Sequence, residues 1–124
     1  MTPFLAFSAI LETLAGLVAL LAPSALGRLL LAASLTGADT PFVRLCGAAL
    51  LALGVACWAG RGDAQVHSGK GLGPAMLVYN LGAVIVLGVS GISSPPGGPA
   101  LWPAVILHAA MAGWCVAASR RGAP

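Results

Sequence analysis

The sequence predicts an all-α fold, a polytopic membrane bundle of four helices forming a single transmembrane domain over residues 1–124. Of its 124 residues, 59% are hydrophobic even before the 17 glycines are counted, and only 7% are charged. About 25% of the residues of a soluble domain are charged, so this chain has too few ionic side chains to coat a water-facing surface. The same composition excludes a disordered chain. Four apolar stretches each have the length needed to cross a hydrocarbon core of ~30 Å.

The four stretches cover about residues 3–22, 40–59, 73–90 and 100–119. A Thr-Pro pair begins each of the first two, and this pair suits an N-cap followed by the first helical position. The segment 91–99 contains three prolines and three glycines, which cannot continue a helix, and it therefore separates the last two spans. Trp102 and Trp114 lie near the two ends of the fourth span, where tryptophan anchors helices at the membrane interface.

Residues 24–35 are strongly apolar but too short to span a membrane. Leu26, Leu29 and Leu30 recur at helical spacing, which indicates a short helix. Two arrangements are open. The segment either lies at the membrane surface or folds over the bundle, or it prolongs the first helix beyond a kink at Pro23.

The basic residues predict the orientation of the chain in the membrane. Arg61, Lys70, Arg120 and Arg121 belong to the side that also holds the N-terminus, and only Arg28 lies in the opposite connections. The positive-inside rule then places both termini in the cytoplasm. The formal charge of +3 is accounted for by this topology, so it does not indicate a nucleic-acid partner.

Glu12 is the most informative polar residue, because an ionisable group at membrane depth costs a few kcal/mol unless it finds a partner or water. Counted from Pro3 at ~1.5 Å per residue, Glu12 lies roughly 13–14 Å inside the first span. It shares a face with Ser8 and Gly16, which is the small and polar face that helices use to approach one another. We expect Glu12 to face the bundle, either as a proton carrier or ligand-binding carboxyl, or as a structural group that fixes helix register.

Each of the other spans also carries a polar side chain. Tyr79 and Asn80 lie in the third span at about the depth of Glu12, and His108 is central in the fourth, close enough in depth for a contact with Glu12. Arg44 lies one turn from the end of the second span and either reaches the interface or turns inward. This pattern is typical of a ligand pocket between facing helices, although a hydrogen-bond network that only joins helices has the same pattern. The predicted ligand-binding residues are Glu12, Arg44, Tyr79, Asn80 and His108.

The sequence offers little other chemistry. Cys46, Cys57 and Cys115 are odd in number and lie within predicted helices, so they imply no disulfide framework. There is no CxxC or HExxH motif, and His108 alone cannot supply both axial ligands of a membrane haem. A catalytic site would need a nucleophile beside a base, and Ser8 with Glu12 is the one such pair in the sequence. We therefore expect no metal, no cofactor and no catalytic residue.

Several segments resemble a family of bacterial membrane proteins. They are LAPS at 21–24, RLCGAALLALG at 44–54, YNLGA at 79–83 and LWPAVILHA at 101–109. Together they resemble four-helix proteins of the broad DoxX-like type. The resemblance implies a left-handed bundle in the bacterial inner (plasma) membrane, in a family whose related groups associate with thiol or quinone redox partners or bind hydrophobic small molecules. The chain departs from the redox groups in lacking paired cysteines.

A second resemblance rests on SAILE at 8–12. It is similar to the first helix of small multidrug exporters, in which one membrane glutamate couples proton and cation exchange in an antiparallel dimer. Here the charge bias favours one orientation, and Arg44 and His108 add positive groups where a cation site would not accommodate them.

Three functions follow from these observations. The chain binds an apolar small molecule or a membrane partner through its intramembrane polar cluster, or it is a proton-coupled transporter centred on Glu12. The third function is that of a non-catalytic accessory or scaffold subunit, whose partner is another membrane protein or, in a homo-oligomer, a further copy of the chain. Outward-facing pairs of small residues, Gly47 with Gly54 or Gly82 with Ala83, would favour that third function.

Overall fold

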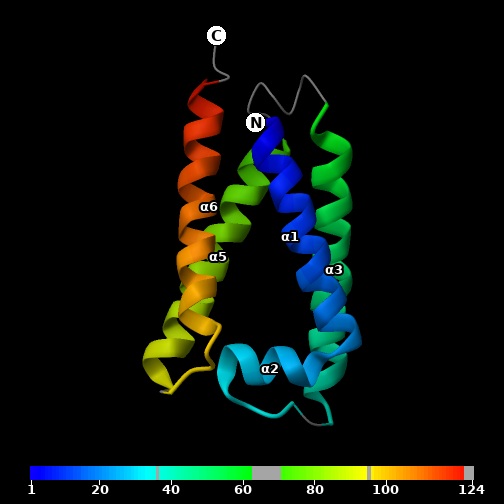
Figure 1. Cartoon of the computed structure of the whole chain (residues 1–124), viewed down its shortest axis with the longest axis vertical. Helices are drawn as coiled ribbons and strands as arrows, with labels where there is room; N and C mark the ends of the chain where they lie inside the picture. The colour runs from blue at the N-terminus through cyan, green and yellow to red at the C-terminus, as the bar shows by residue number, and fades with distance from the viewer. Residues whose placement is uncertain (36, 63–70, 95, 122–124) are drawn as a thin grey trace.

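The computed structural model describes residues 1–35, 37–62, 71–94 and 96–121, and over these residues it is all-helical. The elements are α1 (Thr2–Leu21), α2 (Pro23–Leu31), α3 (Asp39–Gly60), α5 (Leu72–Ser93) and α6 (Leu101–Arg121) (Figure 1). The four long helices are apolar enough to cross a membrane. The expected all-α architecture with four long helices is therefore confirmed, and α5 continues past its expected end at residue 90 to Ser93.

Pro23 begins a new helix and does not simply kink α1. The backbone of Ala22, at φ −136° and ψ 57°, leaves the helical region and ends α1. Pro23 then occupies the start of α2, where its missing N–H would have no helical partner in any case. Of the two arrangements expected for this segment, the separate helix folded over the bundle is the one observed (Figure 1).

The four long helices are organised as two pairs. α1 packs along α3 and α5 packs along α6, whereas contacts between the pairs are sparse. Figure 1 shows the pairs converging near the chain termini and spreading toward α2, which crosses the gap between them. The α1/α3 contact depends on glycine, because a Cβ on Gly47 would lie 2.8 Å from the carbonyl oxygen of Gly16. The two backbones therefore approach as closely as small residues permit.

Backbone hydrogen bonds attach α2 to the segment that leads into α6. The N–H of Gly98 donates to the carbonyl of Leu30 at 3.0 Å, and the N–H of Ala100 donates to the carbonyl of Leu29 at 2.8 Å. A Cβ on Gly98 would collide with the backbone of Leu29, so only glycine permits this approach. α2 thus joins the α1/α3 pair to the α5/α6 pair.

The buried core lies at the end of the molecule where the pairs converge. Phe4, Leu5, Cys57, Met76 and Met111 form its centre. At the same end the Thr2 hydroxyl donates to the carbonyl of Arg61, and the Arg61 guanidinium carbon lies 3.2 Å from the centre of the Trp58 ring.

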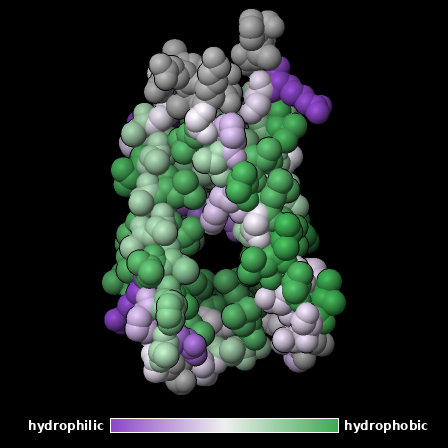
Figure 2. All heavy atoms as spheres, turned by 180° about the vertical axis from the view of Figure 1, so that it is seen from behind, coloured by the Kyte–Doolittle hydropathy of each residue, from purple (hydrophilic) through white to green (hydrophobic). Residues whose placement is uncertain are grey.

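Apart from Arg44, which lies within α3, the basic residues of the described chain divide between the two ends as the sequence predicts. Arg61 lies at the end of α3 beside the N-terminus, Arg120 lies near the C-terminal end of α6 at the same end, and Arg28 is on α2 at the other end (Figure 1). Lys70 lies outside the described residues. Between the ends the exterior is largely apolar (Figure 2), with exposed side chains such as Ile10, Val78 and Ile106. An apolar exterior between two charged ends is suited to contact with lipid.

Candidate ligand site between the helix pairs

A cavity of about 600 Å³ lies between the two helix pairs. Seen from behind, the molecule has an opening at this level, with apolar side chains beside and below it and more polar ones above it (Figure 2). All five helices of the described residues contribute to the wall, and most of the lining is aliphatic. The lining residues are Leu11, Glu12, Ala15, Leu26, Leu30, Leu50, Val78, Tyr79, Gly82, Ala83, Val86, Leu87, Ala104, Leu107 and His108.

Glu12 and Tyr79 are joined across the gap between the pairs. The Tyr79 hydroxyl on α5 donates a hydrogen bond of 2.9 Å to Glu12 Oε2 on α1. Glu12 is only 1% exposed, and its second oxygen, Oε1, is buried with no hydrogen-bond partner among the described residues. The hydroxyl of Ser8, one turn earlier on α1, is buried and unpartnered in the same way. The carboxyl is therefore held by one hydrogen bond, to Oε2, while its other oxygen has no partner among the described residues.

Asn80 and His108 form a second polar pair, between α5 and α6. His108 Nδ1 lies 2.9 Å from Asn80 Oδ1, and Asn80 Nδ2 donates to the carbonyl of Met76 at 2.7 Å. Asn80 is fully buried, whereas His108 is half-buried and lines the cavity. The rings of Tyr79 and His108 meet edge to face with centroids 5.6 Å apart. The two polar pairs consequently form one continuous group on the cavity wall.

Of the five predicted site residues, four come together here. Glu12 and His108 are linked through Tyr79, which lies between them, and they share no hydrogen bond of their own. Arg44 is the exception. It is exposed on α3 and does not line the cavity, to which α3 contributes Leu50.

Sequence reasoning missed the contribution of α2 to this site. Leu26 and Leu30 form part of the cavity wall because α2 turns back across the gap between the pairs. Their spacing indicates a helix with one apolar face, and this face is the pattern from which a contact of α2 with the interior could have been predicted. Gly82 and Ala83, considered above as an outward-facing pair, also line the cavity.

The cysteines make isolated contacts. Cys57 donates to Met76 Sδ at 3.4 Å, Cys115 donates to the carbonyl of Gly73 at 3.3 Å, and Cys46 is exposed. All three thiols are free. Within the described ranges, no three His, Cys, Asp or Glu side chains gather into a group that could hold a metal ion.

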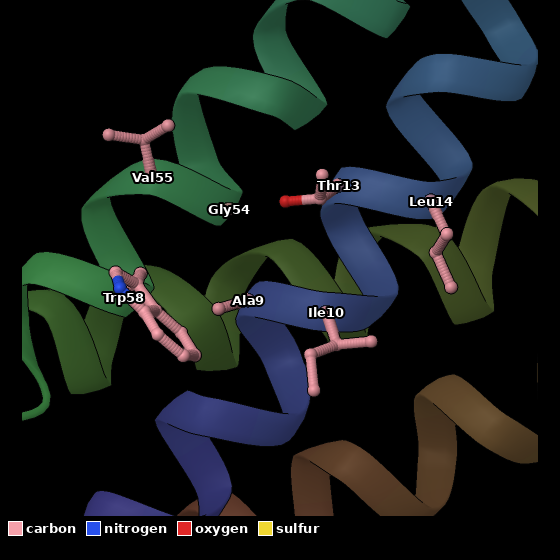
Figure 3. Close-up of a pocket in the computed structure, with 7 residues that line it drawn as sticks. All are labelled: Ala9, Ile10, Thr13, Leu14, Gly54, Val55 and Trp58. Carbon is pink, nitrogen blue, oxygen red and sulfur yellow. The ribbon is translucent and has the colours of Figure 1, made fainter.

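A second, smaller hollow of about 320 Å³ lies on the outer side of the α1/α3 pair (Figure 3). Ala9, Ile10 and Thr13 of α1 face Gly54 and Trp58 of α3 across it. It carries no ionisable side chain, which distinguishes it from the cavity between the pairs.

Comparisons with known proteins add no assignment, since no protein-family model matches the chain and no curated protein or solved structure shows significant similarity to it.

Proposed function

We propose that this membrane protein binds an apolar small molecule in the cavity between its two helix pairs. The observation that carries the proposal is an aliphatic cavity of about 600 Å³ that has Glu12, Tyr79 and His108 on its wall. Ligand sites in proteins are typically ~300–1,000 Å³, mostly apolar, with a few polar groups that orient the ligand. Asn80 does not line the cavity itself, but its Oδ1 atom contacts Nδ1 of His108, which does.

A cavity-filling substitution tests this proposal. Gly82 lines the cavity, and a Cβ placed there would meet nothing within 4 Å, so Gly82→Phe introduces a ring into open space. Gly113 on α6 has an equally open surrounding but does not line the cavity, so Gly113→Phe is the matched control. Native mass spectrometry on protein extracted in native lipid discs should detect a bound small molecule in the wild type and in Gly113→Phe, and should show its loss in Gly82→Phe. A wild-type protein with no bound small molecule, or equal retention by both variants, would contradict the proposal.

Proton-coupled transport centred on Glu12 is the second candidate. The observation that favours it is the buried Oε1 atom of Glu12, which has no partner among the described residues and is free to carry a proton. The test is a flux assay in proteoliposomes with an imposed proton gradient. If Glu12→Gln transports a substrate as fast as the wild type, the carboxyl carries no coupling proton.

An accessory or scaffold role has less support. Gly47 and Gly54 are buried against α1, and Gly82 and Ala83 line the cavity, so neither small-residue pair is presented to a partner chain. A membrane partner would have to use the apolar exterior.

The proposed location is the bacterial inner membrane with both termini in the cytoplasm. Its support is the grouping of Arg61 and Arg120 at the end that holds the N-terminus, opposite Arg28. The bacterial origin and the DoxX-like relationship stay predictions that rest on the sequence segments described above.

A further inference from the structure

The hydrogen bonds of Asn80 determine which nitrogen of His108 carries the proton. Asn80 Nδ2 donates to the carbonyl of Met76, so the amide presents its oxygen, which can only accept, to His108 Nδ1. Nδ1 must therefore be the donor. His108 has no ion pair with any described carboxylate, and an isolated cation is costly at membrane depth, so the ring is in its neutral form. A neutral imidazole has one N–H, and Nε2 is left with a lone pair.

The donors on this wall are already used within the protein. Nδ1 of His108 is engaged by Asn80, and the hydroxyl proton of Tyr79 is engaged by Glu12. Glu12 Oε1 is buried and so does not face the cavity. No described residue bonds to Nε2 of His108, although the ring lines the cavity. The polar groups that this wall presents to a ligand are therefore hydrogen-bond acceptors. They are the lone pairs of His108 Nε2 and of the Tyr79 oxygen.

We infer that the ligand is a lipophilic alcohol or phenol, whose hydroxyl donates a hydrogen bond to His108 Nε2. This inference rests on the proposed function and specifies the ligand of the same site. A ketone or an ether of the same shape has no donor and would leave Nε2 unpaired against an apolar ligand, which costs binding free energy. The apolar part of the ligand contacts the aliphatic wall, which includes Leu26 and Leu30 of α2. The cavity opens on the apolar flank of the molecule, so the ligand is drawn from the bilayer (Figure 2).

The first test reads the tautomer directly. Nitrogen-15 NMR of histidine-labelled protein in lipid nanodiscs, with His108→Phe to assign the signal, should show a protonated Nδ1 and an unprotonated Nε2. In Asn80→Leu, which removes the acceptor, this preference should be lost. A protonated Nε2 in the wild type would overturn the inference, because the site would then offer a donor.

The second test compares three probes with the same number of non-hydrogen atoms, namely 1-hexadecanol, 1-methoxypentadecane and 2-hexadecanone, titrated into nanodiscs and followed by native mass spectrometry. The alcohol should bind about tenfold more tightly than the ether or the ketone, as expected for one hydrogen bond to a buried acceptor. Its addition should also shift the Nε2 signal of His108. In His108→Phe the preference for the alcohol over the ether and the ketone should fall.

The outcomes separate the two proposals. If the three probes bind the wild type equally, or the ketone binds best, the ligand class is wrong while small-molecule binding stands. If none of the probes binds and the extracted protein carries no other small molecule, small-molecule binding itself fails. The comparison of probes on the wild type needs no variant, so it holds even if His108→Phe does not fold.

Discussion

The Tyr79 hydroxyl and Glu12 Oε2, 2.9 Å apart, join two helices that otherwise pack on different partners. α1 lies against α3, and α5 lies against α6, so this hydrogen bond links the two pairs beside the cavity. The ligand-binding wall is therefore also a contact that holds the two pairs together.

Removal of this contact should weaken the molecule. We expect Tyr79→Phe to lower the free energy of unfolding by about 1 kcal/mol, the usual size of an interhelical hydrogen bond in a membrane. The measurement is unfolding in bicelles or in mild detergent. In a Glu12→Leu background the same substitution should cost much less, and equal costs in both backgrounds would show that the two residues are not coupled.

The close approach of α1 and α3 predicts a sharp difference between glycines. Gly47→Ala places a methyl group 2.8 Å from the carbonyl oxygen of Gly16, so the two helices must separate, and we expect a loss of roughly 1–3 kcal/mol. Gly88→Ala is the control, because a Cβ at Gly88 meets nothing within 4 Å and alanine is the better helix former. Thermal unfolding should rank Gly47→Ala below the wild type and Gly88→Ala at or above it. The reverse order would mean that the space between α1 and α3 at Gly47 is wide enough for a methyl group.

The attachment of α2 depends on Gly98. Gly98→Ala collides with the backbone of Leu29 and should displace α2 from the segment before α6. We expect faster amide hydrogen exchange at position 98 and at Ala100, where the N–H groups lose their acceptors, with little change in the middle of α1. Exchange at Ala100 as slow as in the wild type would show that the contact survives.

Arg44 provides a prediction of no effect. Because it is exposed and does not line the cavity, Arg44→Gln should retain the bound small molecule as well as the wild type does. Native mass spectrometry checks this. A loss comparable with that of Gly82→Phe would mean that Arg44 contributes to the site at a distance.

The orientation can be tested with introduced cysteines in a background without native ones. A cysteine at Arg28 should react with a membrane-impermeant maleimide in intact spheroplasts, and a cysteine at Arg120 should react only after the membrane is opened. The opposite pattern would place both termini outside the cytoplasm.

The sequence predicted the four long helices well, since apolar length and the scarcity of charge determine them almost alone. It also predicted that Glu12, Asn80 and His108 face the interior, because the bilayer penalises polar groups that lack partners. The pairing of helices was not predictable in the same way. Glu12 meets Tyr79, and Asn80 meets His108, because α1 packs on α3 while the second pair stands apart, and this depends on contacts between distant segments. Arg44 shares a face with Gly47 by helical spacing, but the structure leaves it at the surface.

α2 has a consequence for how the site could change in size. It is nine residues long, or ~13–14 Å, and it bridges the spread ends of the two helix pairs. The length of α2 thus determines how far apart the two helix pairs stand at that end, and this spacing affects the width of the cavity more than the side chains of the wall do. Lengthening α2 by one turn would widen the space for a ligand without altering Glu12, Tyr79 or His108, so the polar chemistry of the site and its capacity are specified by separate parts of the chain.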